Sequence, residues 1–299
     1  MSVRGVLGFG RTVADLAVTE AFYRDGLGFT RIASPEPVPA AEAEALGLAG
    51  ATQLRMRVGA QDVTFLALDP PGAPYPADPL ATDPFFQHLA IPVRDMAAAF
   101  AQLDRLAPTP ISKSGPQHLP PSSGGVTAYK FRDPDGHPLE LIHFPGGPPA
   151  ERWRDAPGLF LGIDHSAITV TDLDAALAFL TGTLGLRLAE RGLNQGPEQA
   201  RLDGLDEPVV DVLALEPTAP APHLELLHYR EPRTARPTPP PFGPRDRAST
   251  RTVLAADDPA ALARAARATG FPARIARDGL VAYVAGPDGH GLLLVRADA

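Results

Sequence analysis

One pattern occurs four times in this chain of 299 residues: a short alternating strand, an aspartate, and then an amphipathic helix. An internal repeat restricts a chain to folds assembled from one small unit. In each copy the aspartate stands where a helix N-cap belongs, because its carboxylate can accept hydrogen bonds from the free N–H groups of the first turn. The copies span residues 8–16, 88–96, 165–173 and 251–259, and their aspartates are Asp15, Asp95, Asp172 and Asp258.

Two consecutive units form a longer repeat, which occurs twice in the chain. Leu16 of the first copy has its counterpart in Leu173 of the third, and the tetrapeptide that begins at Pro134 (Pro-Asp-Gly-His) returns at Pro287. Both markers recur after roughly half the chain, and short β-branched or aliphatic runs follow each helix. The predicted fold class is therefore α+β, with four βαβββ units that form two half-open β-barrels with helices outside. The predicted strands include 61–68, 128–131, 138–144, 209–215, 223–229, 280–284 and 291–295.

The repeats predict two modules, residues 1–147 with the first two units and residues 158–299 with the last two. The segment 145–157, rich in proline and glycine, is the expected boundary between them. A second proline-rich stretch, 232–244, joins the third and fourth units. Segments 34–50 and 69–84 are expected to be mostly surface loops, since connecting segments are exposed by default.

Composition narrows the range of partners. A formal net charge of −8, with no dense basic cluster, argues against nucleic acid as the main partner. The chain has no cysteine, which excludes disulfides, thiolate metal ligands and a cysteine nucleophile. No segment has the apolar length of a signal peptide or of a membrane span. The expectation is a cytoplasmic protein, a monomer or homodimer, whose partner is a small molecule.

The repeated motif resembles that of the vicinal oxygen chelate superfamily, which includes glyoxalases, bleomycin resistance proteins and extradiol dioxygenases. The resemblance rests on H-x-A-I-x-V-x-D-[LM] before a helix, on the L-G-[FL] that follows, and on the closing D-P-D-G-H-x-L-E-L. It covers almost the whole chain, is weakest in the fourth unit, and is closest to tandem glyoxalase-like proteins. The motif is specific for the fold but not for the reaction, because this superfamily hosts several chemistries.

Strand alternation points four acidic or imidazole side chains to the inner face of the predicted sheets. Successive residues on a strand face opposite sides, so neighbouring apolar residues packed under a helix leave the residue between them facing inward. The four inward residues are His88, Glu140, His165 and Glu225. By resemblance these are the family's ligand positions, and they imply a divalent ion, with Zn, Ni, Co, Mn and Fe all open.

The corresponding positions of the first and fourth units lack metal ligands. They are assigned to Gly8 and Phe65 in the first unit, and to Arg251 (or Thr250) and Leu293 in the fourth. If units paired in sequence order, each barrel would hold one histidine and one glutamate, which is a poor divalent-ion site. If the second unit pairs with the third, all four ligands share one cavity. The second arrangement is the predicted one.

The remaining histidines have weaker claims. A histidine at a strand start is usually structural, so it is the coincidence of four positions that favours a metal site. His137 and His290 are expected to serve their turns, and His143 and His228 to be structural or exposed. His223 shares the inward face with Glu225 and is a candidate neighbour of the ligands. A further loop histidine, His118, is a weaker candidate at the mouth of the site.

Three functions fit these residues. The first is a glyoxalase-like lyase or isomerase, in which Glu225 or Glu140 moves a proton next to a carbonyl held through vicinal oxygens. The second is an Fe(II) ring-cleaving dioxygenase that uses His88, His165 and Glu140. Against it, the position of the extradiol tyrosine holds Lys130. The third is a non-catalytic small-molecule-binding protein with the same cavity. Against it, charged side chains that face inward without a partner are energetically unfavourable.

Overall fold

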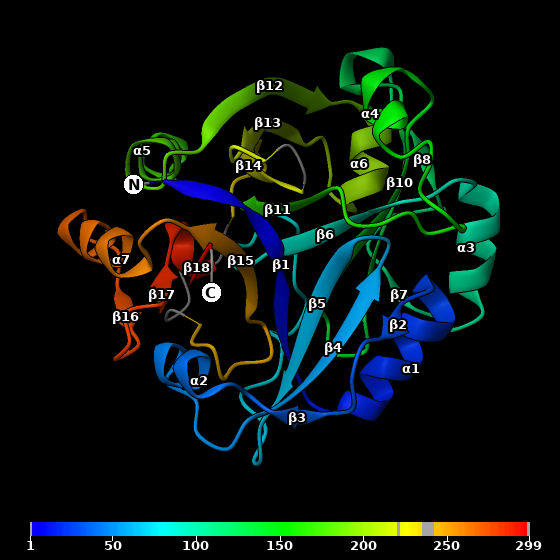
Figure 1. The fold of residues 1–299 in the computed structure, drawn as a ribbon. Helices are drawn as coiled ribbons and strands as arrows, with labels where there is room; N and C mark the ends of the chain where they lie inside the picture. Colours follow the sequence, from blue (N-terminus) through cyan, green and yellow to red (C-terminus); the bar gives the residue numbers. More distant parts are fainter. Residues whose placement is uncertain (1, 220–221, 235–241, 298–299) are drawn as a thin grey trace.

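The computed structural model describes residues 2–219, 222–234 and 242–297. Its strands form two mixed sheets with helices against them, which confirms the predicted α+β class built from four βαβββ units (Figure 1). Part of the proline-rich stretch expected at 232–244, residues 235–241, lies outside the described residues. In the part of the chain that is described, no helix has both the length and the apolar character needed to cross a membrane.

The outer sheet is built from the first and fourth units. Its strand order is β16-β17-β18-β15-β1-β5-β4-β2, and β3 pairs with β4 at one edge. Strands β1 and β15 are antiparallel, and they join the beginning of the chain to its last quarter. The nine described strands are β1 (Val3–Val13), β2 (Thr30–Arg31), β3 (Glu36–Pro37), β4 (Thr52–Val58), β5 (Gln61–Ala67), β15 (Thr250–Ala256), β16 (Ala273–Ile275), β17 (Val281–Ala285) and β18 (Gly291–Arg296).

The inner sheet is built from the second and third units. Its order is β12-β13-β14-β11-β6-β10-β9-β7, with β8 paired to β9, and the antiparallel pair β6–β11 joins the two units. The predicted pairing of the second unit with the third is therefore confirmed. The nine described strands are β6 (Gln87–Pro92), β7 (Thr109–Pro110), β8 (Gln117–His118), β9 (Thr127–Arg132), β10 (Pro138–His143), β11 (His165–Thr169), β12 (Arg187–Gln195), β13 (Val209–Glu216) and β14 (His223–Glu231).

The four repeated helices begin where the aspartates predicted. The carboxylates of Asp15, Asp95, Asp172 and Asp258 each accept a hydrogen bond from a backbone N–H in the first turn of the helix that follows. These helices are α1 (Leu16–Leu27), α3 (Met96–Asp104), α5 (Leu173–Ala178) and α7 (Pro259–Ala268). A single π-helical turn at Phe179–Thr183 extends α5, and Gly28 ends α1 in the left-handed region at φ 69°.

Three shorter helices occur in segments for which no helix was predicted. The expectation of a surface loop at 34–50 is wrong for α2 (Ala40–Leu46), whose Ala45 and Leu46 are buried against the outer sheet. The sequence Ala-Ala-Glu-Ala-Glu-Ala-Leu favours a helix by propensity, but prolines before it and glycine after it obscure the signal. The other two are α4 (Gly147–Arg152), inside the expected module boundary, and α6 (Pro197–Asp203).

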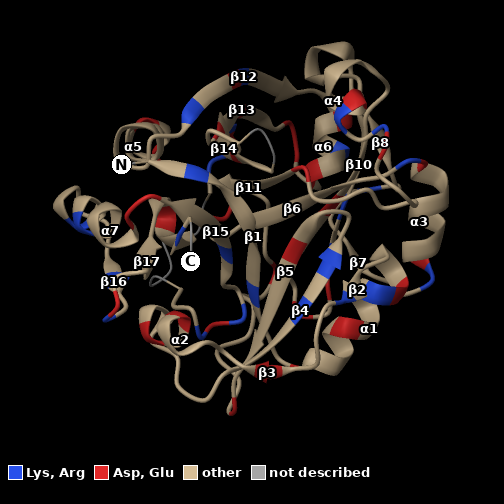
Figure 2. Cartoon of the chain, in the orientation of Figure 1, with Lys and Arg blue, Asp and Glu red and all other residues tan. Residues whose placement is uncertain are grey.

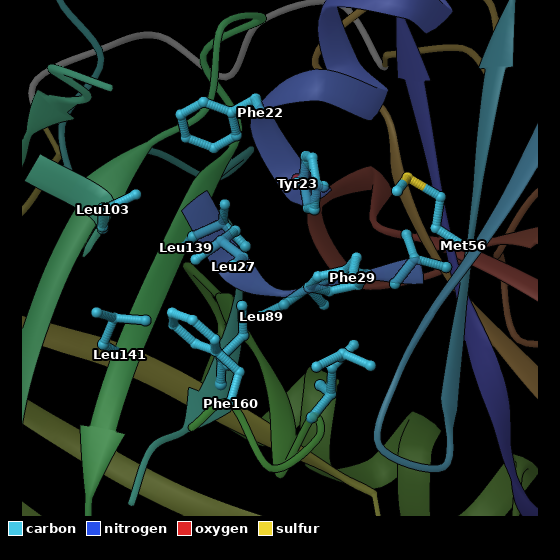
Figure 3. Packing of buried hydrophobic residues seen from close by; sticks show 14 of the residues in the cluster. Phe22, Tyr23, Leu27, Phe29, Met56, Leu89, Leu103, Leu139, Leu141 and Phe160 are labelled. Carbon is cyan, nitrogen blue, oxygen red and sulfur yellow. The ribbon is translucent and has the colours of Figure 1, made fainter. Parts of the chain in front are cut away.

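The hydrophobic cores follow a different division from the sheets. One core combines apolar residues of the first and second units, and Figure 3 shows Tyr23, Phe29 and Met56 of the first facing Leu89 and Leu139 of the second. Another combines residues of the third and fourth units, including Leu226 and Leu254. In Figure 1, α1 and α3 accordingly lie on one side of the molecule, and α5 and α7 on the other. Each sheet thus crosses between two halves that each have their own core.

Candidate metal centre

The inner sheet directs four side chains to the face opposite its helices. On β6, Leu89 and Ile91 are buried in the core under α3, and His88 therefore points the other way. On β10, Leu139 and Leu141 occupy the same core and leave Glu140 on the face of His88. The third unit repeats the arrangement for His165 on β11 and for Glu225 on β14.

Three of these side chains converge on one point. Ligand atoms of His88, Glu140 and His165 all lie within 4.8 Å of one another. The Nε2 atom of His88 is 3.1 Å from Oε2 of Glu140, and the Nε2 atom of His165 is 3.8 Å from the same oxygen. Glu225 reaches the group through His165, with 3.4 Å between its Oε2 and Nε2. The structure thus brings the four predicted residues together in one place.

His88 gives the sharpest test of whether an ion fits here. Its side chain is 2% exposed, and neither ring nitrogen has a hydrogen bond of acceptable geometry with the described residues. A buried imidazole whose nitrogens lack well-aligned hydrogen bonds is unfavourable, because its polar atoms lose their water without full compensation. An ion coordinated by Nε2 would satisfy one of them. The donor set of imidazoles and carboxylates is also the set that Zn, Ni, Co, Mn and Fe accept.

His165 is held by a second carboxylate behind it. Its Nδ1 atom lies 3.0 Å from Oδ2 of Asp164, so Nδ1–H donates to Asp164 and Nε2 faces Glu140 and Glu225. Asp164 is itself fixed by Trp153 Nε1 at 3.1 Å and by Arg152 at 3.2 Å. Histidines that bind metals typically have such a carboxylate behind them, because it sets the tautomer and the ring orientation.

The electrostatics of the group favour a cation. Burial would lower the pKa of His165, but the carboxylates around it, Glu225 first, raise this pKa to about 9. Burial would raise the pKa of Glu225, but the charge of His165 and a hydrogen bond from His223 hold it down at about 2. The carboxylates in the cluster are therefore ionised at neutral pH, and they stabilise positive charge between them.

Lys130 is buried beside this site, and its sequence position predicts neither its burial nor its partner. Lys130 lies opposite Glu140 on the adjacent strand, and its Nζ atom is 2.7 Å from Oδ1 of Asp203. Asp203 also accepts hydrogen bonds from Tyr229 and Gln199. A lysine inside an otherwise buried strand is the signal that could have found it. The signal for Asp164 is weaker, since it is only an acid directly before His165.

His223 lies beside the predicted ligands. Its Nε2 atom is 3.4 Å from Oε1 of Glu225, and with Asp164 and His165 it forms a second group that could hold an ion. The turn histidines are buried and connect units: Nε2 of His137 is 2.9 Å from the carbonyl of Thr12, and Nε2 of His290 is 2.9 Å from that of Thr169. His118 is exposed and contacts Thr127, His228 contacts Asp211, and His143 is half-buried.

The register of the outer sheet corrects one assignment and decides another. Gly10 in the first unit corresponds to Ala90 in the second. Gly10 pairs with Thr64, and Ala90 pairs with Glu140, so Thr64 occupies the position that corresponds to Glu140. The expectation of Phe65 there is wrong, because Phe65 points to the other face and is buried in the core. Gly10 also pairs with Arg251 as Ala90 pairs with His165. Arg251, not Thr250, therefore stands at the position of His165.

Comparison with known proteins places the whole chain in one structural class. It is similar to glyoxalase I from Zea mays, with 17% identity, a TM-score of 0.64 and coverage of 98% of this chain and 92% of that one. A putative dioxygenase from Bacillus subtilis is similar over 100% of this chain and 86% of its own, with 14% identity and a TM-score of 0.61. These likenesses show a shared fold. No curated protein is similar enough in sequence to be matched with the chain.

A family model matches both halves of the sequence. The model described as Glyoxalase/Bleomycin resistance protein/Dioxygenase superfamily aligns with residues 6–141 and again with residues 162–294. The two matches together cover most of the chain, and each contains two of the four repeated units. The predicted resemblance is confirmed, and the chain belongs to the glyoxalase/bleomycin resistance protein/dioxygenase superfamily.

Proposed function

We propose that this protein is a divalent-metal-dependent lyase or isomerase of the glyoxalase type, which moves a proton on a substrate held through vicinal oxygens. The observation that carries the proposal is the buried His88 ring, which is directed at Glu140 and His165 and has no well-aligned hydrogen bond with any residue that the structure describes. In this proposal His88, Glu140, His165 and Glu225 hold the ion, which is Zn, Ni, Co, Mn or Fe. The ion would supply Lewis-acid stabilisation of negative charge on the substrate oxygens.

Glu225 is the better candidate for the base. Its side chain is 19% exposed, against 7% for Glu140, and it lies outside the group of three ligands that converge. A carboxylate in that position can take a proton from the carbon next to a carbonyl and return it to the same or the neighbouring carbon. Glu140 is restrained on both sides, by His88 and by the charge of Lys130.

Ring cleavage at Fe(II) is the second candidate, because the group His88, Glu140 and His165 is also a two-histidine, one-carboxylate triad. The Lys130 position argues against it. Where the extradiol signature has a tyrosine hydroxyl, Lys130 places an ammonium group paired with Asp203. Glu225 is a further residue that the triad would not require.

Three measurements test the proposal. Metal analysis of the purified protein is expected to give about one ion per chain, and Glu140→Gln is expected to lose it. The loaded protein is then incubated in deuterated water with a hemithioacetal of an α-ketoaldehyde, which offers two vicinal oxygens and an acidic C–H bond. Exchange of that hydrogen supports proton transfer. Oxygen consumption with a catechol and Fe(II), without such exchange, would support the dioxygenase, and absence of any bound ion would support a binding protein.

A further inference from the structure

The outer sheet has a cavity of its own. It measures about 340 Å³ and lies on the face that corresponds to the metal centre of the inner sheet. Pockets for small molecules begin at about this size. Much of the wall is apolar, and α2 covers one side with Glu42 and Leu46. From the sheet, the wall includes Gly10, Thr64, Leu66, Arg251, Val253 and Leu293.

Arg251 lies at the bottom of this cavity with part of its guanidinium unused. The residue is 1% exposed, and Nη1 donates to Oγ1 of Thr12 at 2.9 Å and to Oγ of Ser249 at 3.0 Å. Nη2 is buried and has no hydrogen-bond partner among the described residues. A buried N–H group of an arginine without an acceptor is costly, and an acceptor brought by a ligand would remove that cost.

Two glycines make room for this guanidinium. A Cβ atom at Gly10 would stand 3.1 Å from Nε and 3.3 Å from Nη2 of Arg251, and one at Gly291 would stand 2.8 Å from its Cγ. Gly10 and Arg251 both line the cavity, so the guanidinium borders it beside a residue that has no side chain. Strand β1 therefore has a glycine at the position where a larger side chain would stand between the guanidinium and the cavity.

The other charged groups of the cavity are partly committed to one another. Arg55 pairs with Asp62 at 3.2 Å, and Gln53 donates to Glu36 at 3.1 Å. Glu42 lines the same space as Arg251, and the charges of the two residues attract each other. Figure 2 shows the charged residues of this region on the ribbon, with basic residues on β4 and β15 and acidic residues on β5 and α2. Nearby acids disfavour a multiply charged anion, so the arrangement fits a single negative charge.

We propose that this cavity binds the carboxylate of a small monocarboxylic acid with an apolar body, and that Nη2 of Arg251 donates to the carboxylate. Arginine suits this task because its planar donors match carboxylate geometry and keep their charge when buried. The apolar walls of Leu66, Val253 and Leu293 would enclose the rest of the ligand. The position that holds a metal-site histidine in one sheet thus holds an anion receptor in the other.

The experiment compares isovalerate with isovaleramide, which has the same apolar body but no charge. Isothermal titration of the full chain is expected to show one site for isovalerate and binding of the amide at least 10-fold weaker. Arg251→Gln is expected to weaken isovalerate binding by a similar factor. Because that change also removes the bonds to Thr12 and Ser249, Val253→Phe serves as a second variant that fills the cavity and keeps Arg251.

A carboxylate could also bind at the metal centre, so the titration is repeated with His88→Gln. Unchanged affinity in that variant supports the outer cavity. Three outcomes would overturn the proposal: equal binding of acid and amide, full binding of isovalerate by Val253→Phe, or loss of binding in His88→Gln. Absence of isovalerate binding by the folded wild-type protein would overturn it as well.

Discussion

The carboxylate of Asp164 lies 3.0 Å from Nδ1 of its neighbour His165 and leaves Nε2 of that ring facing the two glutamates. This contact predicts the effect of Asp164→Asn. The amide still fills the space but no longer stabilises the ring charge, so the affinity for the ion is expected to fall about 10- to 100-fold. Competition with a coloured chelator measures it. Asp211→Asn removes a carboxylate from the same sheet away from the centre, and an equal loss there would contradict the role of Asp164.

Glu225 and Glu140 are expected to respond differently to the same chemical change. Glu225→Gln should keep the ion, since the three residues that remain, His88, Glu140 and His165, are the ones whose ligand atoms all lie within 4.8 Å of one another. Its hydrogen–deuterium exchange on the substrate should fall about 100- to 10,000-fold, because the base is lost. Glu140→Gln should lose the ion itself, because Glu140 is the one carboxylate of that converging group and lies next to both histidines. Exchange at the wild-type rate in ion-loaded Glu225→Gln would assign the base to another residue.

Tyr23 bridges two buried charges in the core of the first two units. Its hydroxyl accepts from Nη1 of Arg11 at 2.7 Å and donates to Oδ2 of Asp133 at 2.9 Å. Tyr23→Phe should lower the free energy of unfolding by about 1–3 kcal/mol, because both groups lose a partner where water cannot replace it. Urea denaturation measures the change. Tyr129→Phe is the control, since the Tyr129 hydroxyl has no hydrogen-bond partner among the described residues. A similar loss of stability in that variant would contradict the argument.

Asp135 predicts a pH dependence of stability. Burial, and then the charge of Asp133, raise the pKa of Asp135 to about 6, although the Ala14 N–H and Arg247 oppose this. Between about pH 4 and pH 6 the folded state therefore holds a proton that the unfolded chain has released. Stability must fall as the pH rises through this window.

Asp135→Asn removes that proton and can keep the acceptor for Ala14. The difference in unfolding free energy between the variant and the wild type should grow by about 1–2 kcal/mol, in favour of the variant, from pH 4 to pH 6.5. Denaturation curves at several pH values measure it. A difference that stays constant over the window would contradict the raised pKa.

Much of the fold follows from local signals. Asp15 and Asp258 mark helix starts because a short acidic side chain satisfies the free N–H groups of a first turn wherever the helix packs. The pairing of the second and third units was predicted from the distribution of His88 and Glu225, which only one pairing brings together. The division into modules 1–147 and 158–299 stays a prediction.

The errors arose where a neighbouring strand decides the outcome. Phe65 and Thr64 differ by one position, and a shift of one residue exchanges the two faces of a strand. Only the pairing of Thr64 with Gly10 fixes which of them faces the cavity. The sequence motif shows Lys130 only in the place of a tyrosine, because its partner Asp203 comes from a helix of another unit. Contacts between residues so far apart in the sequence, such as Lys130 with Asp203, produce no local sequence pattern from which they could be predicted.

The pairing of β1 with β15 also has a consequence for the order in which the molecule is assembled. During synthesis the inner sheet can be completed once Glu231 has emerged, and it already contains all four proposed ligands. Strand β1 is synthesised before these strands and pairs with β5 along one edge. Its other edge can pair only after residues 250–256, which form β15, have been synthesised. Because contacts distant in sequence form slowly, closing this outer sheet is the expected late step of folding. The segment with the four proposed ligands therefore lies between β1 and β15, the two strands whose pairing is expected last.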